Sequence, residues 1–138
     1  MFSGASSINN KFELNSFSAC FGSNKGAVVL VEDSATFEDV GSTFSGNSAL
    51  QGGAIYVELG TVTLQDTRLL HNYAYQGSAV FVGSGAQLVQ TGGTVYQNIA
   101  AHSGAYYYKE LITTQTLSGV TFEENQAVQG AAIYLQEA

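Results

Sequence analysis

Hydrophobic and polar positions recur with a fixed period along most of the chain. A hydrophobic residue stands three positions before an Asn, small residues follow, and an Ala then opens a β-branched or aromatic run, as in residues 44–57 and 69–82. Two further copies occupy residues 95–108 and 122–135. Successive Asn residues lie 25, 26 and 27 positions apart, whereas each Asn precedes its Ala by seven positions. A repeat of this length indicates a solenoid.

The residues within each repeat predict strands. They combine β-branched and aromatic runs with Gly-rich turns and lack the apolar periodicity of a helix. We predict an all-β, right-handed parallel β-helix (solenoid) of about five coils with 25–27 residues per coil, in which each strand pairs in parallel with its copy about 4.8 Å away. Residues 17–138 would form the β-helix repeats, and residues 1–16 an N-terminal partial coil or cap.

The first copy of the repeat is degenerate. Phe17-Ser-Ala-Cys20 stands seven positions before Ala27, so that Cys20 takes the place of the Asn. Phe12-Glu-Leu-Asn15 fits the letters of the repeat better but lies five positions too far from Ala27. We favour the alignment by spacing.

Stacked coils place equivalent residues in columns along the axis. The Asn residues would form a structural ladder, because an amide both donates and accepts hydrogen bonds and Asn tolerates left-handed backbone geometry. A second column contains only Ala, where the chain bends into the next strand and only small residues fit. The Asn ladder is Asn47, Asn72, Asn98 and Asn125, and the Ala column is Ala27, Ala54, Ala79, Ala105 and Ala132.

Strand alternation separates the residues after each Ala. We expect one set to point inward: Val28, Leu30, Ile55, Val57, Val80, Val82, Tyr106, Tyr108, Ile133 and Leu135. The set between them would point outward with Val29 and form an exposed contact stripe: Tyr56, Phe81, Tyr107 and Tyr134. Such an aromatic stripe could stack on sugar rings or pack against a partner chain. Two alternatives stay open: the stacked rings only stabilise the sheet, or the parity of the strand is the opposite one.

Two tetrapeptides carry a resemblance to a known family. Phe44-Ser-Gly-Asn47 and Gly52-Gly53-Ala54-Ile55 resemble the Phe-x-x-Asn and Gly-Gly-Ala-Ile motifs of the chlamydial polymorphic outer-membrane protein repeat, and the resemblance covers roughly residues 17–138. It implies a right-handed β-helical passenger segment of a surface autotransporter, located at the cell surface or outside the cell. The partner implied is a surface protein or glycan of a host or neighbouring cell.

Charge and composition exclude several functions. Four Lys and Arg residues against eleven Asp and Glu residues give a net charge of -7, which repels nucleic acid. No apolar run approaches the roughly 18 residues of a membrane span, so we expect no direct membrane insertion. We also expect that any secretion signal lies outside these residues. Cys20 is the only cysteine, which excludes an intrachain disulfide and a cysteine-based zinc site.

We predict that the protein is not an enzyme, with no catalytic residue, cofactor or metal. The main rival is a carbohydrate-binding or carbohydrate-active β-helix, in which Asp39 and Asp66, 27 positions apart, would be stacked acids. We favour the alternative that both are solvated turn residues. His71 and His102 occupy different positions in their coils, and Gly83-Ser84-Gly85 has the composition of a strand-to-strand turn.

The other rival is a self-assembling subunit of an extracellular filament. The chain stops three residues after Leu135 with no evident cap. An open coil exposes unpaired backbone groups, which predicts axial association by head-to-tail contact or continuation into further coils.

Overall fold

The computed structural model describes residues 9–110 and 113–136, and every regular element within them is a strand. No helix in this part of the chain is long and apolar enough to cross a membrane. In chain order the strands are β1 (Asn9–Glu13), β2 (Ser16–Ser18), β3 (Val29–Val31), β4 (Thr36–Val40), β5 (Thr43–Ser45), β6 (Ile55–Val57), β7 (Thr61–Gln65), β8 (Arg68–Leu70), β9 (Tyr73–Gln76), β10 (Val80–Val82), β11 (Gln87–Thr91), β12 (Thr94–Tyr96), β13 (Ile99–Ser103), β14 (Tyr106–Lys109), β15 (Thr116–Ser118), β16 (Thr121–Glu123) and β17 (Ile133–Gln136).

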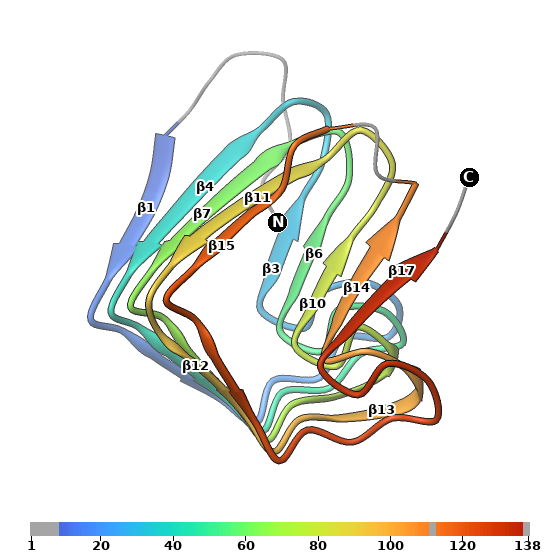
Figure 1. The fold of residues 1–138 in the computed structure, drawn as a ribbon. Helices are drawn as coiled ribbons and strands as arrows, with labels where there is room; N and C mark the ends of the chain where they lie inside the picture. The colour runs from blue at the N-terminus through green and yellow to red at the C-terminus, as the bar shows by residue number, and fades with distance from the viewer. Residues whose placement is uncertain (1–8, 111–112, 137–138) are drawn as a thin grey trace.

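The strands form a parallel β-solenoid of about five turns, as predicted. Three sheets of five strands each have the orders β1-β4-β7-β11-β15, β3-β6-β10-β14-β17 and β2-β5-β8-β12-β16. A fourth, two-stranded sheet joins β9 and β13. Figure 1 shows the coils stacked from blue to red, with the three large sheets around the interior and the β9–β13 segments bulging at one corner.

The interior contains the inward positions of the three large sheets. Val80 and Tyr106 lie in register with Ile55, and Val82 and Tyr108 with Val57, and all of them belong to one buried apolar cluster. The predicted parity is therefore confirmed for the coils from β6 onward.

The first coil is displaced by one residue from the prediction. Val29 pairs with Ile55 and Leu30 with Tyr56, so Val29 and Val31 face inward in place of Val28 and Leu30. The amides of Val28 and Val29 both donate to the carbonyl of Ala54, as those of Ala54 and Ile55 do to Ala79. Val28 thus takes the place predicted for Ala27. One additional residue between Cys20 and β3 causes the displacement. Phe21 pairs with Ser48 and Lys25 with Gln51, so the first coil uses four positions between these two bridges where the second coil uses three.

The left-handed backbone positions lie at the corners, but not at the Asn residues. The residue before each ladder position has a positive φ: Ala19, Gly46, His71, Gln97 and Glu124. A second corner has the same property at Leu14, Gly41, Asp66, Gly92 and Gly119. The expectation that Asn itself adopts this geometry is wrong, because its role is in the side-chain ladder.

The predicted N-terminal cap or partial coil, residues 1–16, is described only in part. Within it, β1 pairs with β4 over its full length, and Phe12 packs against the core. Residues 1–8 lie outside the described part, so the boundary at residue 16 stays a prediction.

Candidate contact surface

The Asn ladder is a buried hydrogen-bond chain along the axis. The backbone N and side-chain Nδ2 of Asn72 donate to Oδ1 of Asn98 at 2.8 and 3.0 Å. Nδ2 of Asn72 also donates to the carbonyl of Phe44 in the preceding coil at 3.0 Å. Asn47 and Asn98 repeat this pattern. In each of these three rungs, the backbone N–H and the side-chain amide donate three hydrogen bonds, two to Oδ1 of the next Asn and one to a backbone carbonyl, so these Asn side chains have a structural role.

Cys20 occupies the ladder position of the first coil. Its backbone N donates to Oδ1 of Asn47 at 3.0 Å, as an Asn in that position does. The alignment of Phe17 with Phe44 follows from the pairing of β2 with β5. The choice of spacing over the Phe12–Asn15 match is therefore confirmed, and Cys20 is the rung that lacks an amide oxygen.

The aromatic stripe is buried, so the prediction that it is exposed is wrong. Tyr56, Phe81 and Tyr107 are 3%, 2% and 3% exposed, and Tyr134 is half-buried. The successive ring centroids are 4.9, 4.8 and 5.2 Å apart, with planes within 20° of parallel. These rings point away from the main core into a separate cluster. Strand alternation predicts the direction of each ring correctly, but the rings of adjacent coils cover each other.

A charged cluster closes the aromatic stripe at the first coil, where Leu30 takes the place of a ring. Nζ of Lys25 lies 4.7 Å from the ring centroid of Tyr56 and donates to Glu58 at 3.2 Å and to Glu32 at 3.5 Å. The Tyr56 hydroxyl donates to Glu58 at 3.1 Å. Burial, assisted by the Glu58 charge and opposed by Lys25, raises the pKa of Tyr56 to about 12.

Asp39 and Asp66 do not form a carboxylate pair. Asp39 pairs in register with Leu64, because this coil contains 25 residues rather than 27. Asp39 is buried inside the solenoid, where Oδ2 accepts hydrogen bonds from the Ser42 amide and the Thr67 hydroxyl. Its Oδ1 has no hydrogen-bond partner among the described residues. Asp66 is an exposed corner residue, so the solvated-turn interpretation holds for Asp66 and fails for Asp39.

The remaining chemical candidates lie apart from one another. His71 contacts Tyr96 edge to face, whereas His102 stacks on Tyr75 and hydrogen-bonds Ser103. Gly83-Ser84-Gly85 connects β10 to β11 as the predicted turn, and Ser84 donates to Glu110. Within residues 9–110 and 113–136, no group of three or more His, Cys, Asp or Glu residues could hold a metal ion.

Six exposed apolar side chains lie elsewhere, on the segments that follow the ladder positions. We call this surface the open face and define it by the exposed side chains of Phe21, Leu50, Tyr73, Tyr75, Ile99 and Val128. Sequence reasoning missed it because these segments were treated as turns. The alternation in β9, where Tyr73 and Tyr75 flank the buried Ala74, is the signal that could have revealed it.

The open face carries no carboxylate. None of the eleven Asp and Glu residues occurs in residues 20–26, 47–52, 72–77, 98–104 or 125–130. The one Lys or Arg residue in these segments is Lys25, whose ammonium group is paired with Glu32 and Glu58. An acidic protein therefore has one lateral surface that is apolar and close to neutral.

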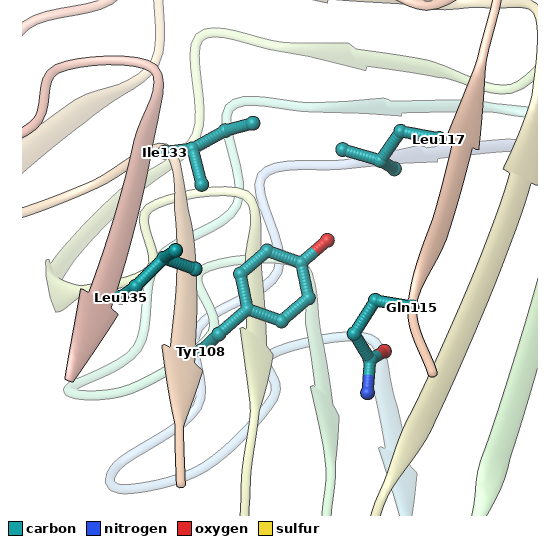
Figure 2. A pocket seen from close by; sticks show the side chains of 5 residues that line it. All are labelled: Tyr108, Gln115, Leu117, Ile133 and Leu135. Carbon is teal, nitrogen blue, oxygen red and sulfur yellow. The ribbon is translucent and has the colours of Figure 1, made fainter. Parts of the chain in front are cut away.

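The interior itself reaches solvent at the last described coil. Figure 2 shows Tyr108 between Ile133 and Leu135 of β17 on one side and Gln115 and Leu117 on the other. These five residues line a pocket of about 280 Å³. Ile133 and Leu135 are 39% and 57% exposed, whereas Val80 and Val82, at the same positions two coils earlier, are 0% and 1% exposed. The pocket is thus the open end of the core between two sheets.

Taken together, the stacked sheets, the Asn ladder and the ring column define a repeat protein of the parallel β-solenoid class. Two segments, residues 41–58 and 119–136, match the Chlamydia polymorphic membrane protein (Chlamydia_PMP) repeat. The chain therefore carries this repeat on its solenoid. No curated protein and no solved structure matches the chain significantly.

Proposed function

We propose that the chain is a β-solenoid segment of a cell-surface or extracellular protein, with a structural role as a rigid stalk and an adhesive role through its open face. The observation that carries the proposal is the polymorphic membrane protein repeat in residues 41–58 and 119–136. The open face supports the adhesive part, because contiguous exposed apolar surface marks interaction sites. The buried ladder and the buried aromatic stripe supply the rigidity that such a stalk requires.

Filament assembly and carbohydrate chemistry, the two rival functions, are less well supported by the contacts of the Asn ladder and of the two aspartates. Head-to-tail stacking of two copies would set Asn125 against Cys20, which has no amide oxygen for the donors of an Asn rung. A carbohydrate-active site needs two acids facing one substrate. Asp39 faces the interior and Asp66 the solvent, so the pair considered from the sequence offers no such arrangement.

Antibodies against the isolated chain test the surface location. On intact cells of the organism that encodes it, they are expected to label the outside without permeabilisation. Labelling that appears only after permeabilisation would contradict the proposal.

Cell binding by the fluorescently labelled chain tests the adhesive role. A Phe21→Ser, Tyr73→Ser double variant is expected to bind at least about tenfold less, as loss of interface anchors predicts. Leu59→Asn is the control, because Leu59 is an exposed apolar residue outside the open face and Asn tolerates its positive φ. Equal loss in both variants would argue against a specific role of the open face.

A further inference from the structure

One column of the open face holds two aromatic residues that are separated by a serine. Backbone bridges place Phe21 in register with Ser48, Ser48 with Tyr73, and Tyr73 with Ile99. Ser48 thus separates two aromatic residues that lie two coils apart. Because adjacent strands are about 4.8 Å apart, the Phe21 and Tyr73 positions are separated by about 9.6 Å along the axis. We call the space above Ser48 the ring slot.

The spacing of the ring slot suits one inserted aromatic ring. In the aromatic stripe of the same molecule, rings in adjacent coils stack at 4.8 to 5.2 Å between centroids. A ring placed midway between the Phe21 and Tyr73 positions would lie about 4.8 Å from each of them, which is the stacking distance of the stripe. Phe21 is 81% and Tyr73 48% exposed, so both side chains are accessible to a ligand.

We infer that the ring slot binds an aromatic side chain of a partner polypeptide. The inference rests on the proposed contact role and names the partner for it. The exposed apolar side chains of Leu50 and Ile99 belong to the same face, and the polar side-chain groups of the slot itself are the hydroxyls of Ser48 and Tyr73. A sugar site needs several convergent hydrogen-bonding groups, whereas buried Trp and Tyr side chains dominate the energetics of protein interfaces.

The charge of the partner follows from the same surface. No carboxylate lies in the segments that form the open face. The slot therefore offers no ion-pair partner to a basic residue next to the inserted aromatic residue of the partner. The remainder of the chain carries the net charge of -7 and repels acidic partners. The expected partner segment is therefore a neutral to basic polypeptide that presents one exposed aromatic side chain.

Titration of the isolated chain with N-acetyl-tryptophanamide, followed by NMR, tests the slot. Saturable shifts are expected at the ring signals of Phe21 and Tyr73. Ser48→Phe fills the slot with the protein's own ring and should weaken binding at least tenfold. Ser45→Phe, the same change on the outer side of β5, should leave it unchanged. Phe21→Ala removes one wall at an exposed position and should also weaken binding, so the test does not depend on the folding of the Ser48 variant.

The contrary outcomes are distinct. Shifts that do not saturate, or equal binding by Ser48→Phe and the wild type, would overturn the slot. Saturable binding of N-acetylglucosamine oligomers at the same residues would show that the partner is a glycan, not a polypeptide. A concentration-dependent dimer in sedimentation that is abolished by Ser48→Phe would show that the partner is a second copy of this chain. These results leave the surface location untouched, because labelling of intact cells tests that location independently.

Discussion

Two columns of side chains on this solenoid differ in one respect, and the difference decides which is structural and which is available for contact. The aromatic stripe is continuous, and each interior ring is covered by a ring above and below it. The Phe21–Ser48–Tyr73 column is interrupted by a serine, and both of its rings are exposed. On a solenoid, then, the exposure of an aromatic residue depends on its neighbours in adjacent coils as much as on its own strand.

The largest expected effect comes from emptying the continuous column. Phe81→Ala removes the central ring, which is 2% exposed, and should destabilise the fold by about 3–5 kcal/mol. Phe21→Ala in the interrupted column should change the free energy of unfolding by less than about 0.5 kcal/mol, as at other exposed sites. Chemical denaturation of the two variants gives the comparison. Similar losses would show that both columns are structural.

The ladder tests whether the segments of the open face are anchored by buried amides. Asn98→Leu removes the acceptor for two donors of Asn72 and should cost about 1–3 kcal/mol. Gln97→Asn is the control at the adjacent corner, because it keeps a polar residue that tolerates the positive φ. Thermal unfolding of the two variants should show a clear shift only for Asn98→Leu. Equal shifts of the melting temperature in the two variants would mean that the buried Asn ladder contributes no more to stability than the adjacent corner residue.

Two inward-facing tyrosines beside the stripe should respond in opposite directions. The Tyr106 hydroxyl donates to Gln90 inside the core, so Tyr106→Phe should destabilise the fold by about 1 kcal/mol. The buried Tyr108 hydroxyl has no hydrogen-bond partner among the described residues. Tyr108→Phe should therefore be neutral or stabilising by about 1 kcal/mol. Urea denaturation midpoints give both values, and a loss on Tyr108→Phe as large as that on Tyr106→Phe would contradict this account.

The alkaline response of the stripe is expected only above the ordinary pKa of tyrosine. The pKa of Tyr56 is raised from 10.0 to about 12, first by burial and then by Glu58. Above about pH 10 the unfolded chain loses this proton while the folded chain keeps it. The free energy of unfolding is therefore independent of Tyr56 ionisation below pH 10 and decreases between pH 10 and pH 12. Tyr56→Phe should reduce this slope in denaturation experiments across that range. An unchanged slope would show that Tyr56 is not sheltered by the stack.

The fold could be predicted from the sequence where equivalent positions of successive coils hold the same type of residue. The repeated Asn residues fixed the spacing of the coils. Cys20 was placed correctly, although Ala27, from which its position was counted, lies one residue before the Ala column. The displacement of the first coil could not be predicted, because the extra residue before Val28 changes no motif letter. Asp39 and Asp66 were paired by an average period, whereas their own coil has 25 residues between partners.

The candidate site was harder to predict than the fold. Alternation within one strand gives the direction of Tyr56 but does not include Phe81 in the next coil, which covers it. Tyr73 and Phe21 were passed over because short segments with Gly at their ends have the composition of turns. Ser48 lies between them in the column, and this position can be recognised only once the register between coils is known.

The measurement that tests the central claim most directly is nitration of the folded protein by tetranitromethane, read residue by residue by mass spectrometry. Tyr73 and Tyr75 of the open face should react readily, and Tyr56 and Tyr107 of the aromatic stripe should react only after unfolding, because the former are exposed and the latter buried. Rapid modification of Tyr56 and Tyr107 together with protection of Tyr73 and Tyr75 would reverse the assignment of the two columns and contradict the account.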